Sequence, residues 1–392
     1  MKYNRLLLLL LFSLPVWANQ TPEWYWGGFA TQVVSATDAN HFISSGKEGI
    51  TAGMHEVGFY STWRPAPNFH LSGQVISRKA GAVDDGSIKL DYLLADFSLS
   101  KSTAVQYGLR IGKIKIPYGF YNDTRDVSFT RPSIILPQSL YFDQARDLEL
   151  SADGALFYAH IPISDMRLDI DLLLGQPKKD KNVEFAYLSD DLSGRFIDSL
   201  GFMSRAVLLD DSERWKVGLT LGAINLAYRV GAANEFGLTS GDMKIGVAVL
   251  GGEYNTENWT FTAEYMMQRV DWSELGGVFS LDPTNDFESY YAQVKYRMSP
   301  TVDLIARYDV LYLDTDDRNG LKTQALFGKP AYSQWAKDFT LGVGWQLTSD
   351  LSVRMEWHRV FGTAWLPEQD NPDVSATEKN WNLYLMQFGY RF

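Results

Sequence analysis

The stretch KDFTLGVGWQLT, residues Lys337–Thr348, alternates between apolar and polar or small side chains over its whole length. One set of alternate positions is apolar and consists of Phe339, Leu341, Val343, Trp345 and Leu347. The other set consists of Asp338, Thr340, Gly342, Gly344, Gln346 and Thr348. Successive side chains of a β-strand point to opposite faces, so this period of two predicts a strand with one apolar face and one polar face.

The same alternation recurs in other long segments, such as NWTFTAEYMMQ (258–268), TVDLIARYDV (301–310) and DLSVRMEWH (350–358). These segments are near the length of a tilted strand that crosses a membrane, and longer than the ordinary globular strand of about five or six residues. WKVGLTLGAINLAYRV (215–230) changes phase near Asn225, which predicts a β-bulge there.

The connections between the predicted strands alternate between short and long. The short ones lie at 64–68, 100–102, 162–165, 210–213, 255–258, 299–301 and 348–350, and the long ones are polar and rich in Asp, Asn, Gly and Pro. This pattern predicts an all-β fold: a transmembrane antiparallel β-barrel of about sixteen strands, with short periplasmic turns and long extracellular loops.

The N-terminus MKYNRLLLLLLFSLPVWANQ has a basic start, an apolar run and a small residue, Ala18, at a suitable cleavage point. It predicts a signal peptide over residues 1–18, followed by a single barrel domain over 19–392. Loss of Lys2 and Arg5 takes the net charge from −11 to −13. This acidic balance argues against nucleic-acid binding, and the absence of cysteine excludes disulfides and thiolate metal sites.

The chain ends LYLMQFGYRF, with apolar or aromatic residues at alternate positions: Tyr384, Met386, Phe388, Tyr390 and Phe392. This ending resembles the C-terminal signature of Gram-negative outer-membrane proteins, which implies an outer-membrane location and recognition by the barrel assembly machinery. The chain as a whole resembles the sixteen-stranded porin superfamily, and residues 112–133 resemble the phosphate-selective porin-like group. The resemblance further implies contact with outer-membrane lipid and assembly as a homotrimer.

The segment Lys115–Asp147 interrupts the strand pattern with three prolines and a group of apolar residues that includes Ile134, Ile135, Leu136 and Phe142. It is the third long loop, which in porins folds into the barrel and narrows it. The predicted constriction residues are the charged side chains Lys113, Lys115, Asp123, Arg125, Asp126, Arg131, Asp143 and Arg146. Opposed charges across a narrow passage select by charge. The alternative is that several of them pair with one another and hold the loop in place.

The predicted function is a porin that passes small hydrophilic solutes or ions by diffusion, without a cofactor, a bound metal or catalysis. Two alternatives stay open: a channel that binds a specific solute, such as an anion, phosphate or sugar, and a barrel hydrolase. The five histidines lie in no recognisable catalytic or metal-binding motif, and His70 and His358 are expected in a solvated lumen. The aromatic run Trp24–Phe29 is expected at the membrane interface rather than in a sugar-binding track.

The predicted outer loops after the third are rich in acid, at Glu274, Asp282, Asp314, Asp316, Asp317, Glu368, Asp370, Asp373 and Glu378. At the external mouth they are expected to attract cations at low salt. If Arg125 and Arg131 face the pore unpaired, selectivity is expected to drift toward anions as the ionic strength rises.

Overall fold

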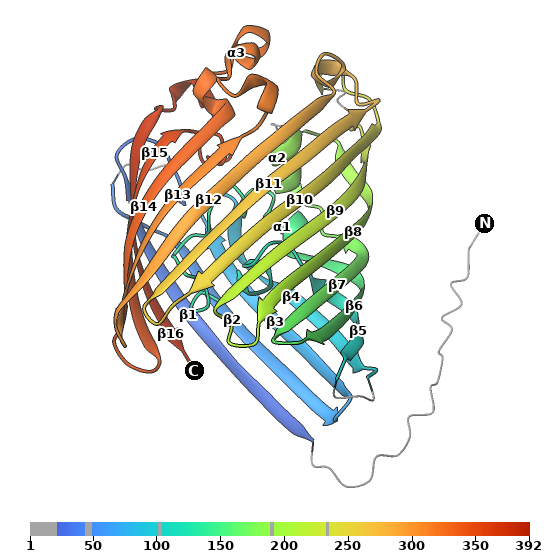
Figure 1. Ribbon diagram of the computed structural model, residues 1–392. Helices are drawn as coiled ribbons and strands as arrows, with labels where there is room; N and C mark the ends of the chain where they lie inside the picture. Colours follow the sequence, from blue (N-terminus) through green and yellow to red (C-terminus); the bar gives the residue numbers. More distant parts are fainter. Residues whose placement is uncertain (1–21, 44–48, 101–103, 189–191, 233–234) are drawn as a thin grey trace, which may run out of the picture.

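In the computed structural model, sixteen strands close into one antiparallel barrel in which each strand pairs with the next along the chain, and β1 pairs with β16 (Figure 1). The structure describes residues 22–43, 49–100, 104–188, 192–232 and 235–392, so the predicted signal peptide lies outside the described residues. The predicted all-β barrel and its strand number are confirmed.

The strand bounds follow the predicted segments closely. The strands are β1 (Glu23–Thr37), β2 (Thr51–Ala66), β3 (Phe69–Ala80), β4 (Asp84–Ser98), β5 (Gln106–Lys115), β6 (Ser151–Ile163), β7 (Met166–Pro177), β8 (Arg195–Asp210), β9 (Trp215–Arg229), β10 (Gly241–Asn255), β11 (Trp259–Ser273), β12 (Thr284–Ser299), β13 (Val302–Tyr312), β14 (Trp335–Gln346), β15 (Leu351–Gly362) and β16 (Asn380–Arg391).

The helices of the described residues are short and lie in the connections. The α-helices are α1 (Arg146–Leu150), α2 (Lys181–Leu188) and α3 (Leu321–Phe327), and the 3-10 segments are η1 (Asn122–Thr124), η2 (Glu235–Gly237), η3 (Gly277–Ser280), η4 (Thr315–Asp317), η5 (Ala331–Gln334) and η6 (Val374–Ala376). None of these helices has the length and apolar character needed to span a bilayer.

The two faces of the barrel wall differ as the alternation predicts. In β14, Phe339 and Trp345 are 40% and 54% exposed on the outer face, whereas Asp338 and Thr340 are 2% and 0% exposed on the inner face. The apolar side chains therefore point outward and the polar side chains point into the barrel, the reverse of a soluble sandwich.

The connections separate into two rims, with six of the predicted short turns at the lower rim in Figure 1 and the longer loops, including the one that carries α3, at the upper rim. The seventh predicted turn, 100–102, lies largely outside the described residues. At the lower rim, Trp24, Tyr25 and Trp26 are exposed at the start of β1. Their place at one edge of the wall fits the predicted aromatic belt at a membrane interface.

The predicted bulge near Asn225 is wrong, because β9 pairs with β10 without a register shift. The irregularity lies in the neighbouring strand β8, between Phe196 and Asp198. The apolar positions shift from one face of β9 to the other because Leu226 and Tyr228 are buried side chains that point inward. They join an apolar cluster around α2, so the inner face of β9 is apolar at this level without a change of register.

The last strand closes the barrel with its aromatic edge outward. Tyr384, Phe388, Tyr390 and Phe392 are exposed, while Leu383 and Leu385, on the other set of alternate positions, are buried. The backbone N–H of Phe392 donates to the carbonyl of Gly28, and the N–H of Gly28 donates to the carbonyl of Phe392. A β-carbon on Gly28 would lie 2.5 Å from the Phe392 ring, so β1 needs glycine here for the ring to pack.

Candidate pore constriction and vestibule

The third loop, residues 116–150 between β5 and β6, lies inside the barrel. Its apolar side chains pack in two directions. Ile134 and Ile135 join a cluster with residues of β1, β2 and β13–β16, and Leu136, Leu140 and Tyr141 join a second cluster with strands β5–β8 and β10–β12. The predicted folding of this loop into the lumen is borne out by its position, although the loop extends to Leu150 because α1 precedes β6.

Arg131 ties the third loop to the wall at β2. Its two terminal nitrogens donate to the two carboxylate oxygens of Glu56, at 3.0 and 2.5 Å. Arg131 is 5% exposed and Glu56 is 0% exposed. Paired fork-to-fork geometry of this kind gives the strongest and most directional contact between an arginine and a carboxylate.

A chain of alternating charges continues from this pair. Arg78 of β3 lies 3.4 Å from Glu56 and 2.9 Å from Asp143, and it also contacts Asp84. Asp143 in turn lies 3.4 Å from Arg146 of α1. All of these groups except the partly exposed Asp143 are buried, so each charge depends on its neighbours in place of water.

The chain of charges ends at the neighbouring strands β4 and β5. Arg146 contacts Asp126, and Asp126 lies 2.6 Å from Lys115, which also contacts Asp91 of β4. Arg125, which is 1% exposed, donates to the carbonyl of Tyr141 at 3.0 Å and lies 3.2 Å from Glu149.

Two of the predicted constriction residues sit at the margin of this network. Lys113 is half-buried and donates to the carbonyl of Leu90. Asp123 is exposed on the loop and pairs with Arg205 of β8 at 2.6 Å. Arg125 and Arg131 are buried and paired, so the condition for an anion-selective pore, that they face it unpaired, is not met.

Other strands of the wall, among them β11 nearly opposite β2, also hold the third loop. Glu264 of β11 accepts hydrogen bonds from the Tyr141 hydroxyl at 2.6 Å and the Phe120 N–H at 2.9 Å. Arg307 of β13 donates to the Ser133 hydroxyl at 2.9 Å, and Arg354 of β15 donates to the Ser128 carbonyl at 3.1 Å. The loop therefore crosses the lumen and is fixed at both sides.

Sequence reasoning missed the wall partners of the loop, which are Glu56, Arg78, Asp84, Asp91, Glu264, Arg307 and Glu356. A usable signal was present, because strand alternation places charges such as Glu56 and Arg307 on the face opposite the apolar residues. Which loop residue each charge meets depends on packing across the barrel, which alternation does not specify.

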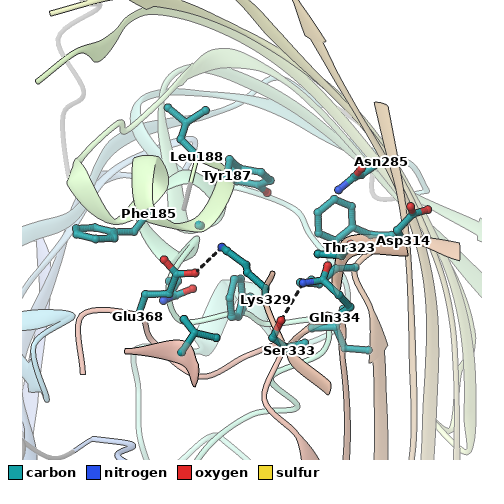
Figure 2. A pocket seen from close by; sticks show the side chains of 18 of the residues that line it. Phe185, Tyr187, Leu188, Asn285, Asp314, Thr323, Lys329, Ser333, Gln334 and Glu368 are labelled. Atoms are coloured by element: carbon teal, nitrogen blue, oxygen red, sulfur yellow. Dashed lines mark hydrogen bonds and ion pairs between the residues drawn. The ribbon is translucent and has the colours of Figure 1, made fainter. Parts of the chain in front are cut away.

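Above the third loop lies a cavity of about 500 Å³, here called the vestibule. The loop supplies its floor with Leu140, Phe142 and Glu149, and the walls come from α2, β11–β13 and the connections after β9, β11, β13 and β15. Figure 2 shows Phe185, Tyr187 and Leu188 of α2 on one side and Asn285, Asp314 and Thr323 on the other, with the ion pair of Lys329 and Glu368 between them.

Glu149 is the ionisable group at the vestibule floor. Burial raises the pKa of its carboxyl to about 7, although the nearby Arg125 guanidinium acts in the opposite direction. The charge of this group therefore changes near neutral pH, and with it the charge balance of the floor.

His358 does not have the geometry of a catalytic triad. His358 is fully buried, so the expected solvated lumen position is wrong for it; its Nδ1 lies 2.7 Å from Asp338 and 3.0 Å from the Thr340 hydroxyl. A triad needs the carboxylate and the nucleophile on opposite ring nitrogens, whereas Nε2 here faces Glu356 at 3.4 Å. His70 pairs with Asp96 at 3.5 Å and is partly exposed. No cluster suited to a metal ion occurs in the described part of the chain.

The barrel resembles solved structures of outer-membrane proteins over almost its full length. It matches the outer-membrane protein OmpT of Vibrio cholerae with a TM-score of 0.57 at 12% identity, over 95% of this chain and 99% of that chain. For the outer membrane channel DcaP of Acinetobacter baumannii the TM-score is 0.58 at 9% identity, over 95% and 97%. For OprB of Pseudomonas putida it is 0.55 at 10% identity, over 94% of each chain.

No protein-family model matches the chain, and no curated protein matches it in sequence. The likeness to solved structures concerns the fold, which is that of outer-membrane β-barrel proteins.

Proposed function

We propose that a chain with this fold is an outer-membrane channel, in which solutes diffuse passively through the barrel and the third loop sets what passes. The single observation that carries the proposal is the path of the loop, which crosses the lumen and is fixed to β2 through Glu56 and to β11 through Glu264. A sixteen-stranded barrel is wide enough for an aqueous channel, so an inserted loop determines the narrowest cross-section.

In this proposal the eight predicted constriction residues act mainly by holding the loop. Arg125, Arg131 and Arg146 lie within a network in which neighbouring opposite charges offset one another at short range. Asp123, whose side chain is 41% exposed, is the member best placed to meet a passing ion. The alternate apolar residues from Tyr384 to Phe392 serve assembly into the outer membrane and contact its lipid.

The test is single-channel conductance in a planar bilayer for the intact protein and for a variant in which residues 121–145 are replaced by a short Gly-Ser linker. We expect a small conductance for the intact protein and a several-fold larger one for the variant. A matched variant that shortens the α3 connection instead, at residues 318–328, should change the conductance much less. Equal conductance of the intact protein and the third-loop variant would contradict the proposal.

A second candidate function is a channel that binds one class of solute, and the vestibule favours it. General diffusion through a barrel uses a polar, water-filled interior. Here the space above the third loop is lined largely by apolar side chains, among them Phe142, Phe185, Phe287 and Leu311.

A further inference from the structure

The vestibule has the size of a ligand pocket. Its volume of about 500 Å³ falls within the range of cavities that enclose small organic molecules. It opens at the rim of the long loops and ends at the third loop, so a molecule entering from that rim would meet it before the constriction.

The lining of the vestibule is apolar on every side. Its large apolar side chains come from the third loop, α2, three wall strands and four other connections, and they are Leu140, Phe142, Phe185, Leu188, Phe236, Leu238, Met266, Trp272, Val278, Phe279, Phe287, Leu311, Leu313, Phe327 and Leu366. Phe236, Val278 and Phe327 are 65%, 43% and 37% exposed. Such exposure of large apolar groups is costly in water and marks surfaces that bind apolar partners.

Three buried polar groups in the vestibule wall lack a hydrogen-bond partner among the described residues: the Ser139 hydroxyl, the Trp272 indole N–H and the Thr363 hydroxyl. These residues are 3%, 6% and 6% exposed. Buried polar groups are nearly always paired, because leaving one unpaired is costly to the folded protein. They stand at separate points of a wall whose large side chains are mostly apolar, as hydrogen-bonding groups do in ligand pockets.

Each charged group of the lining has a partner of opposite charge, although two of these partners, Lys322 and Arg125, lie just outside the lining. Lys329 lies 3.4 Å from Glu368. Lys322 lies 2.7 Å from Asp282 and 3.7 Å from Asp314. Glu149 at the floor lies 3.2 Å from Arg125, so each lining charge has a partner of opposite sign and none is left free for a ligand. The arrangement therefore favours a neutral ligand over an anion or a cation.

We propose that the vestibule is a binding site for a neutral amphipathic molecule, with an apolar or aromatic body and one or two hydrogen-bonding groups, held above the third loop. The body would lie against Phe185 of α2 and Phe327 of α3, and the polar groups would pair with Ser139, Trp272 or Thr363. The direction of transit rests on the proposed channel function, but binding itself does not.

The test is isothermal titration calorimetry of the protein in amphipol with 2-(1-naphthyl)ethanol, which carries a neutral head group. 2-(1-Naphthyl)ethylammonium and 1-naphthylacetate have the same body with a positive or a negative charge, and ethanol has the head group alone. We expect saturable binding of the neutral probe, binding of both ions about tenfold or more weaker, and no binding of ethanol. Equal heats for all the naphthyl probes, or none above the amphipol blank, would overturn the proposal.

Two neighbouring residues of α3 provide a matched pair of variants. Phe327 lines the vestibule, whereas Leu326 is 52% exposed and is not part of the lining. Phe327→Ser should weaken binding of the neutral probe ~5- to 10-fold through lost apolar contact, and Leu326→Ser should leave it unchanged. Phe185→Ser tests the opposite wall in the same way. Equal effects of the two α3 variants would place the probe outside the vestibule.

The unpartnered hydroxyl of Thr363 provides a second test, which distinguishes a role in ligand binding from a role in stability alone. Thr363→Val keeps the shape and removes a group without a partner, so the empty protein should be at least as resistant to heat. The same change should weaken the naphthylethanol probe ~3- to 10-fold, and 1-ethylnaphthalene, which lacks the hydroxyl, should bind both proteins equally. If Thr363→Val, Ser139→Ala and Trp272→Phe all leave the naphthylethanol affinity unchanged, the assignment of the polar groups is wrong.

Failure of this inference differs from failure of the channel proposal. A barrel that conducts ions but binds none of the naphthyl probes would refute the vestibule site and leave the channel standing. A barrel that binds the neutral probe but conducts nothing, even with the third loop replaced, would refute the channel and leave the site.

Discussion

Arg131 holds the third loop to the wall through the buried pair with Glu56. We predict that Arg131→Met lowers the free energy of unfolding by about 3 kcal/mol, because removing one partner leaves a buried charge. Glu56 keeps Arg78 at 3.4 Å, which places the loss at the low end of the expected range. The measurement is a urea titration followed by the change in gel mobility of the unheated protein.

The matched control at the residue scale is the double variant Glu56→Gln with Arg131→Met. Since it removes both charges together, its loss of stability should be smaller than the sum of the two single losses. Strictly additive losses would mean that the two side chains do not stabilise each other.

At this scale the sequence predicted which charged residues lie on the polar face of a strand, but not which of them contact one another. Alternation placed Glu356 and His358 on the polar face of β15, and both are buried there. It gave no sign that Glu356 accepts from the N–H of Ile134, more than two hundred residues away. Such contacts depend on how the loop folds in three dimensions.

At the scale of a single element, β16 has two roles. It carries aromatic side chains on the outer face of the barrel, and it closes the barrel through the backbone hydrogen bonds of Phe392 with Gly28. We predict that Phe392→Ala strongly lowers the amount of protein in the outer membrane and leaves the single-channel conductance of the folded remainder unchanged, because the ring lies outside the lumen. Membrane fractionation and planar-bilayer recording measure the two effects. Phe361→Ala on the outer face of β15 is the control, and an equal loss in that variant would argue against a special role of the terminal residue.

The helix α2 carries a pH dependence at its N-terminus. Asp180 accepts hydrogen bonds from the N–H groups of Asn182 and Val183, and burial together with neighbouring Asp147 raises the pKa of its carboxyl to about 7. Burial also acts on Asp147, but the hydrogen bond from Asp180 and the Lys178 ammonium hold the pKa of Asp147 below its usual range. The two carboxyl groups thus share a proton in the folded state.

The sign of the effect follows from this sharing. Between pH 4 and about 7 the unfolded Asp180 loses its proton while the folded one keeps it, so the docking of α2 weakens as the pH rises through this window. We predict more hydrogen-exchange protection of the α2 amides at pH 5 than at pH 8, after correction for intrinsic rates. Asp180→Asn keeps the cap and should remove the difference. Protection that is equal at both pH values in the unaltered protein would contradict the prediction.

The helix α2 also shows what sequence periodicity cannot predict. Its eight residues are too few for a clear helical pattern, and they are stable because Val183, Tyr187 and Leu188 are buried against the barrel interior. The same packing produced the apparent change of phase in β9. The strands were predictable because each alternates by itself, whereas these elements take their form from tertiary contacts.

For the whole molecule, the acid-rich loops and the paired arginines predict one selectivity pattern. At low salt the channel should prefer cations, because the loops at the external mouth are negatively charged. This preference should fade once the ionic strength exceeds about 0.1 M, because salt then screens charges more than roughly 10 Å apart. No reversal toward anions is expected, because Arg125 and Arg131 are buried and paired. Reversal potentials across salt gradients test this, and anion preference at high salt in the intact protein would show that these arginines reach the pore.

The whole barrel was predictable from the sequence in its strand number, its two unlike faces and its two rims. These properties repeat in every hairpin, so errors in one segment do not accumulate. The vestibule was not predictable, since residues such as Phe142, Phe236 and Leu366 come from separate loops and share no sequence pattern.

The backbone hydrogen bonds between Phe392 and Gly28 place the last strand directly beside the first. An even number of strands brings the end of β16 and the start of β1 to the rim of the short turns (Figure 1). A circular permutant, with Phe392 joined to Pro22 by a linker that spans the six residues from 23 to 28 and new ends opened in the turn at Ser164 and Asp165, would keep every strand pair. It should refold in detergent to a heat-modifiable barrel while lacking a terminal Phe, and would thereby separate the order of strands in the gene from their order around the barrel.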